Sequence, residues 1–173
     1  LDDDTASLSM SAVAEASSST DEPLLVVSED GGEDSLVVRL TAQPSADVTV
    51  SLTSTDETEA RLATNQVTLS PTTWKTGVTV KVSGVDDRDI DGIQRYEILA
   101  RIVAVQGGSI ADPAFSAAVD AGVEVRIAGF NVDDDKFGIL LSDPSTTTTE
   151  DGGKSYLLVS YRLNPSEEDN PQL

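Results

Sequence analysis

The sequence predicts an all-β protein whose main domain is a Greek-key β-sandwich of seven or eight strands. Apolar and polar residues alternate over short runs, most sharply in Val78-Thr79-Val80-Lys81-Val82, which is the period of a half-buried strand. Clusters of Gly, Pro, Asp and Ser separate these runs and indicate turns. No stretch has a convincing helical period. Many short strands divided by turns are typical of a sandwich.

The expected strands follow one another along the first three quarters of the chain. They lie at residues 8–13, 24–27, 36–40, 48–52, 67–69, 78–82, 96–105 and 119–127. The weakest is the first, because residues 11–16 could instead form coil or a short helix. Residues 106–115 contain Gly and Pro and are expected to form a loop.

The composition excludes several classes of function. The chain has 173 residues, with 31 acidic and 11 basic side chains and a net charge of −20, so nucleic acid and anionic lipid are not expected partners. It contains no Cys and no His, which excludes disulfides, thiolate chemistry and imidazole ligands. No apolar run approaches the ~20 residues of a membrane span, so direct membrane insertion is not expected.

An acidic run, Asp86-Asp87-Arg88-Asp89-Ile90-Asp91-Gly92, is the strongest candidate for a binding site. Two carboxylates ~4 Å apart repel by roughly 4 kcal/mol at an effective dielectric of 20, so a folded cluster needs full solvation or a cation. Oxygen ligands in a flexible loop suit Ca²⁺. An EF-hand is excluded, because its twelfth position counted from Asp87 is Ile98 instead of Glu. A solvated acidic loop is the alternative.

The other acidic residues are sorted toward one end of the expected sandwich. Because successive strands cross the sandwich, successive loops alternate between its two ends. The same end receives Glu29 and Asp30, then Asp56, Glu57 and Glu59, then the acidic run, and finally Asp133, Asp134 and Asp135. The loops at the other end hold Asp47 and Asp112. The pattern predicts a calcium-binding pole, and a merely solvated end is the alternative.

An internal repeat predicts the domain organisation. Glu29-Asp30-Gly31-Gly32 returns 121 residues later as Glu150-Asp151-Gly152-Gly153, and Pro44 returns at the same offset as Pro165. The opening Leu1-Asp2-Asp3-Asp4 matches residues 132–135 at an offset of 131. We therefore expect the acidic end of a preceding repeat or linker at 1–4, a complete sandwich at 5–135, and the first strands of a second repeat at 136–173. Such a period indicates a tandem array of domains, and thus a longer protein.

Several of these segments resemble the Calx-beta superfamily, in the form repeated in large bacterial and algal cell-surface proteins. The matching pieces are residues 27–32, Gln43-Pro44 with residues 47–50, Trp74 before 78–80, residues 84–92, residues 112–115, and residues 132–135. The resemblance implies an immunoglobulin-like sandwich that binds calcium at one pole. It assigns as ligands Glu29, Asp56, Asp86, Asp87, Asp133, Asp134 and Asp135, with Asp89 and Asp91 as further acids. Arg88, which interrupts the acidic run, and Phe115, which replaces a commoner Tyr, depart from the pattern.

We therefore expect a non-catalytic, extracellular structural or adhesive repeat that binds Ca²⁺ and stiffens a tandem array. Its partners would be adjacent repeats, with other surface proteins or glycans as further candidates. A regulatory calcium sensor is the alternative. A carbohydrate-binding module or glycosidase is less favoured, because the chain has one Trp, three Tyr and three Phe with which to line a cleft. Trp74 could stack on a sugar, but a plug at the end of the core is the expected role.

Overall fold

The computed structural model describes residues 6–13, 24–103, 113–142, 148 and 150–163. The chain divides into two compact units. The first comprises Leu1–Asp87 and Gly92–Asp133, and the second comprises Arg88–Asp91 and Asp134–Leu173. The repeat boundaries expected from the sequence stay predictions.

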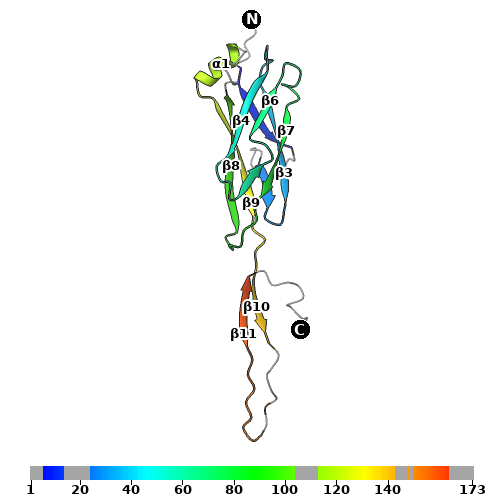
Figure 1. The fold of residues 1–173 in the computed structure, drawn as a ribbon, viewed down its shortest axis with the longest axis vertical. Helices are drawn as coiled ribbons and strands as arrows, with labels where there is room; N and C mark the ends of the chain where they lie inside the picture. Colours follow the sequence, from blue (N-terminus) through cyan, green and yellow to red (C-terminus); the bar gives the residue numbers. More distant parts are fainter. Residues whose placement is uncertain (1–5, 14–23, 104–112, 143–147, 149, 164–173) are drawn as a thin grey trace. The chain divides into compact units, whose positions relative to one another are not determined.

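The first unit is an all-β, immunoglobulin-like sandwich, which confirms the predicted fold class (Figure 1). One sheet has the order β1 (Leu8–Ala12), β3 (Glu33–Leu40), β7 (Val78–Gly84), β5 (Ala60–Leu62). The other has the order β2 (Leu24–Ser28), β9 (Glu124–Val132), β8 (Ile93–Val103), β4 (Val48–Ser54), β6 (Gln66–Leu69). Neighbouring strands are antiparallel except for β2, which runs parallel to β9.

The core lies between the sheets and is formed by the predicted alternation. Along β8, Tyr96, Ile98, Ala100 and Ile102 are buried, as expected, and Ala104 lies outside the described residues. Val80 and Val82 of β7 are also buried. Full burial of such a side chain stabilises the fold by about 1.5–3 kcal/mol. Trp74 is half-buried and packs against this core, as expected for a plug.

The prediction that the chain has no helix, with a strand beginning at residue 119, is wrong. Helix α1 spans Pro113–Asp120, and β9 begins five residues later than expected, at Glu124. Pro is favoured at a first helical position, and alanines favour the helix that follows. Phe115 and Ala118, three residues apart, are buried on one face. Gly122, with φ 65°, ends the helix as Gly commonly does. Asp112 and the rest of the expected loop before Pro113 lie outside the described residues.

Two further differences concern strands. One strand was expected near this part of the chain, at 67–69, but residues 60–69 form two. The chain passes from β5 in one sheet to β6 in the other. Residues 11 and 12 belong to β1, so the helical alternative for 11–16 is wrong at these positions, and residues 14–16 lie outside the described part. In the second unit, β10 (Phe137–Leu141) and β11 (Val159–Leu163) form an antiparallel pair.

Candidate functional site: the acidic pole

Asn131, at the end of β9, is the centre of the acidic pole. Its side chain is completely buried, and its Nδ2 donates to Glu29 Oε1 at 3.3 Å, to Glu59 Oε2 at 3.1 Å and to the Val85 carbonyl at 3.2 Å. Glu29 and Glu59 are 4% and 8% exposed. One neutral amide therefore holds two buried carboxylates from segments far apart in the sequence.

Backbone hydrogen bonds fix the segments that carry these side chains. The Glu29 N–H donates to the Val132 carbonyl at 3.1 Å, and the Val85 N–H donates to the Glu59 carbonyl at 3.0 Å. The Gly84 N–H donates to the Gly32 carbonyl at 3.2 Å. The turn before β3 is therefore tied both to the end of β9 and to the end of β7, so the positions of the carboxylates are set by the sandwich itself.

Gly84 is required where the segments meet. A Cβ at this position would lie 2.3 Å from the Ser28 carbonyl oxygen and 2.7 Å from Asn131 Oδ1. Real Cβ atoms essentially never approach other atoms so closely, and the Ser28 oxygen is backbone that cannot rotate away. The close approach of β7 to the turn after β2 thus depends on a residue without a side chain.

The first two aspartates of the acidic run, Asp86 and Asp87, lie at the same pole. A carboxylate oxygen of Glu29 lies within 4.8 Å of one of Asp86, and another pairing of the same kind joins Glu29 with Asp87. The run ends at the exit of β9, where the Gly92 N–H donates to Asp133 Oδ2 at 2.8 Å and the Asp133 N–H donates to the Gly92 carbonyl at 3.3 Å. Sorting of these acids to one end, expected from strand order, is thus observed.

The remaining predicted ligands are placed differently. Asp56 is half-buried and accepts hydrogen bonds from the Thr58 hydroxyl and N–H, which hold the pKa of Asp56 below its usual range. It is engaged in its own turn. Asp89 and Asp91 are exposed and belong to the second unit. Asp134 and Asp135 also belong to that unit. The ligand role of every predicted residue stays a prediction.

Two residues of the pole were absent from the predicted ligands. Glu59 was noted as one of several acids in a turn, with nothing to mark it as buried. Asn131 did carry a signal, because it continues the inward alternation of Ile127 and Gly129 along β9. A polar side chain at an inward position of a strand needs hydrogen-bond partners, and such a residue can be recognised in the sequence from the alternation alone.

The donor set fits a hard cation. Ionised carboxylates within 4.8 Å of one another repel by at least roughly 3.5 kcal/mol at an effective dielectric of 20, and a divalent ion between them converts this repulsion into attraction. The pole offers oxygen ligands, and the chain has no His or Cys that would favour zinc or copper. Among the residues of the first unit, Glu29 lies close enough to Asp86 or to Asp87 for their carboxylates to hold such an ion together. The buried Glu59 shares the Asn131 amide with Glu29.

No family model matches the chain, and no curated protein matches it. Solved structures similar in fold include SSP-19, an MSP-domain-like protein of Caenorhabditis elegans, at 12% identity, TM-score 0.42, covering 63% of this chain and 94% of that one. The E. coli chaperone DraB matches at 9% identity, TM-score 0.44, with 92% and 85% covered. An apo-form Calx CBD1 domain also matches, at 16% identity, TM-score 0.35, with 73% and 97% covered.

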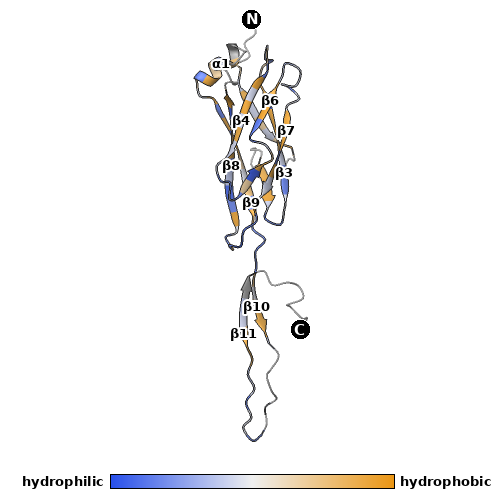
Figure 2. Ribbon diagram, viewed as in Figure 1, coloured by the Kyte–Doolittle hydropathy of each residue, from blue (hydrophilic) through white to orange (hydrophobic). Residues whose placement is uncertain are grey.

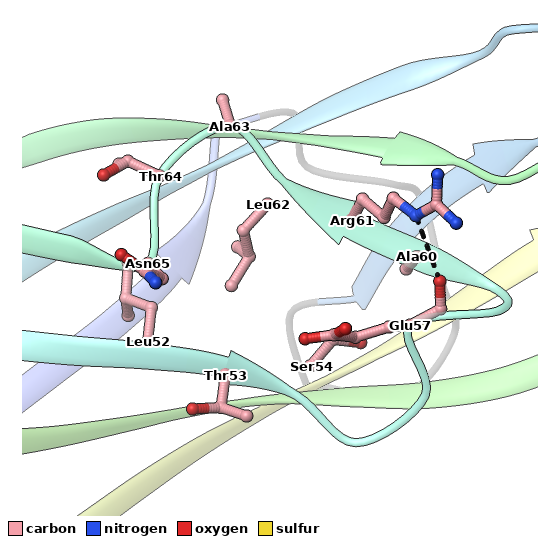
Figure 3. Close-up of a pocket in the computed structure, with 10 residues that line it drawn as sticks. All are labelled: Leu52, Thr53, Ser54, Glu57, Ala60, Arg61, Leu62, Ala63, Thr64 and Asn65. Atoms are coloured by element: carbon pink, nitrogen blue, oxygen red, sulfur yellow. Dashed lines mark hydrogen bonds between the residues drawn. The ribbon is translucent and has the colours of Figure 1, made fainter.

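A separate cavity of about 480 Å³ opens between β4 and β5 (Figure 3). Leu52 and Leu62 form its apolar part, and Glu57 and Arg61 line it where the Arg61 Nε donates to the Glu57 carbonyl at 3.3 Å. Its lining residues include one carboxylate and no aromatic ring. A glycosidase needs two carboxylates, and sugar binding commonly uses an aromatic platform, so this cavity does not favour either.

Within the described residues, no helix is long and apolar enough to cross a membrane.

Proposed function

We propose that the first unit is a non-catalytic, calcium-binding structural repeat of an extracellular or cell-surface protein, with an adhesive or spacer role. The observation that carries the proposal is the pair of buried carboxylates, Glu29 and Glu59, held on Asn131, with Glu29 also close to Asp86 and Asp87. Burial of like charges is costly unless they are paired or coordinate a metal. An oxygen-only site of this kind suits Ca²⁺.

Asp133, Asp134 and Asp135 connect calcium binding to an array. They leave β9 as consecutive residues, so ligands here would also be the link to the next domain. Calcium that neutralises this link removes repulsion between carboxylates and stiffens the junction. Extracellular calcium modules bind at 10⁻⁴ to 10⁻³ M, and calcium at ~100 times its dissociation constant would stabilise the fold by about 2.7 kcal/mol per site.

Thermal unfolding of the whole chain in EDTA and in stepwise Ca²⁺ tests the site. We expect millimolar Ca²⁺ to raise the midpoint of the wild type, and Glu59→Gln and Asp87→Asn to lose most of this gain. Glu57→Gln is the matched control, because Glu57 is an exposed carboxylate of the same turn as Glu59. Equal midpoints in EDTA and calcium, or an equal gain in Glu59→Gln and Glu57→Gln, would reject the proposed site.

The same titration separates this function from the regulatory sensor. A structural repeat saturates near millimolar calcium, whereas a sensor saturates at 10⁻⁷ to 10⁻⁵ M. Small-angle scattering of the chain in EDTA and in calcium tests the stiffening. Calcium could raise the unfolding midpoint without changing the radius of gyration. That result would support a stabilising calcium site and reject the stiffened junction.

A further inference from the structure

The two strands of the second unit repeat a strand pair of the first unit residue for residue. In β10 and β11, Ile139 pairs with Tyr161, Leu140 with Ser160, and Leu141 with Val159. Shifted by the two repeat offsets, 131 for β10 and 121 for β11, these become Leu8 with Leu40, Ser9 with Arg39, and Met10 with Val38. These are the observed partners of β1 and β3. A slip of one residue would exchange the two faces, so the agreement fixes which face corresponds.

The turn that precedes β3 in the first unit also has a counterpart between β10 and β11. Gly152 has φ 88° and Gly31, at the same offset of 121, has φ 92°. Glu150 and Asp151 form a turn before Gly152, as Glu29 and Asp30 do before Gly31. Register and turn are separate observations, and both make the hairpin equivalent to the β1 and β3 region.

The equivalent faces differ in burial. Along β3, Leu36, Val38 and Leu40 are 0–3% exposed, whereas their counterparts Leu157, Val159 and Tyr161 are 51–77% exposed. Along the partner strand, Leu8 is 5% exposed and Ile139 is 66% exposed. Phe137 stacks on Tyr161 with ring centroids 5.8 Å apart and extends the same apolar face. Figure 2 shows the hydrophobic residues of β10.

We propose that β10 and β11 are the β1 and β3 strands of a second sandwich, and that their apolar face is covered by a segment of the same polypeptide equivalent to residues 43–133. In the first unit, β1 contacts β8 and β9 of the facing sheet, and β3 contacts β2. Strands β8 and β9 lie within residues 43–133. A two-stranded hairpin is marginal in water, and sheet-on-sheet packing is what buries such a face. The proposal goes beyond calcium binding and does not depend on it.

A chimera of the chain's own parts tests the occupant. Residues 1–163 are followed directly by residues 43–135, which is the in-register junction because residue 163 corresponds to residue 42. Hydrogen exchange of residues 137–141 and 159–163 is compared with the same residues of the 173-residue chain. We expect exchange to slow by about 100-fold or more in the chimera, because these amides join a cooperative core.

Two variants of the chimera test the face. Tyr161→Asp places a charge on the apolar face and is expected to abolish the added protection. Ser160→Asp is its matched control, because Ser160 pairs with Leu140 on the other face of the two strands. This variant is expected to retain the protection.

A tandem duplicate of residues 5–135 shows independently that two such domains fold in one chain. If the duplicate folds and the chimera leaves the hairpin unprotected, the proposal is overturned. It is also overturned if the 173-residue chain self-associates in sedimentation and protects its hairpin without any added segment, since a second copy would then be the occupant.

Discussion

The first unit handles its acidic residues in two contrasting ways. On the outer face of β8 and β9, Glu97 and Glu124 alternate with arginines whose side chains are 59–64% exposed. Arg126 contacts both acids, at 3.2 Å from Glu97 and 2.6 Å from Glu124, and Arg101 also contacts Glu124. At the pole, Glu29 and Glu59 are buried and share the amide of Asn131.

The difference shows what each group of carboxylates needs. On the face, arginine and water already compensate the charge, so these ion pairs contribute little and need no metal. At the pole, a neutral amide donates hydrogen bonds without cancelling charge, and burial makes the remaining repulsion larger. Total acidity is therefore a poor guide to where this protein would need a cation, and burial of acids around a neutral donor is the better one.

The largest expected effect comes from Gly84→Ala, which breaks the pole at its backbone. The added methyl group meets the Ser28 carbonyl oxygen and Asn131 Oδ1, so β7 or the turn must move and the Asn131 hydrogen bonds are disturbed. We expect a loss of about 3–4 kcal/mol in the free energy of unfolding, measured by urea denaturation, and loss of the stabilisation by calcium.

Gly129→Ala is the matched control. Its Cβ would meet the ring of Tyr96 at 2.3 Å, within the sandwich, so this variant is also expected to be destabilised. It should keep the calcium gain, because Glu29, Glu59 and Asn131 retain their contacts. Loss of the calcium gain in both variants would mean that the response follows general stability and not the pole.

Asn131→Leu has a smaller expected effect and tests the amide alone. It keeps an apolar volume in place but removes the donor that Glu29 and Glu59 share. We expect a loss of about 2–3 kcal/mol in EDTA, since a hydrogen bond to a charged group contributes about 1.5–3 kcal/mol. Asn131→Asp should be at least as unstable in EDTA but should gain more from calcium than the wild type. An Asn131→Asp variant that calcium does not rescue would contradict a cation at this place.

The fold was largely predictable because most of its strands show a clear alternation of apolar and polar residues. The runs 48–52, 78–82 and 96–102 face the core as their apolar residues require. Helix α1 was missed because it is eight residues long and, among Phe115–Asp120, whose burial is described, Phe115 and Ala118 are the buried residues. The sequence therefore has no long helical period. The division into β5 and β6 was missed because the alternation of apolar and polar residues does not show which of the two sheets a strand joins.

The gathering of acids at one end of the sandwich was predictable, but which of them are buried there was not. Strand order alone sends Glu29, Asp86, Asp87 and Asp133 to one end, since it depends on parity and not on contacts. Among the acids of the turn after β4, however, the resemblance to the Calx-beta superfamily implied Asp56, whereas the structure buries Glu59. These two are three residues apart, and the choice depends on the hydrogen bonds of Thr58 and Asn131, which exist only after folding.

The smallest expected effect comes from Glu124→Gln, which tests the ion pairs on the outer face of β8 and β9. Hydrogen bonds from Arg101 and Arg126 hold the pKa of Glu124 below its usual range, against the opposing effect of desolvation. A carboxyl whose pKa is lowered on folding contributes stability above its unfolded pKa of about 4.3, and this contribution is lost as pH falls through the lowered value. At pH 7 we expect the variant to unfold about 1–2 °C below the wild type, because the arginine partners are 59–63% exposed and ion pairs of this kind contribute little. The difference should shrink in 0.5 M salt and as the pH falls below about 4, while the calcium gain is unchanged.

A calcium gain that falls with Glu124→Gln would show that the face and the pole are coupled, and the distinction between acids that need a cation and acids that do not would then fail.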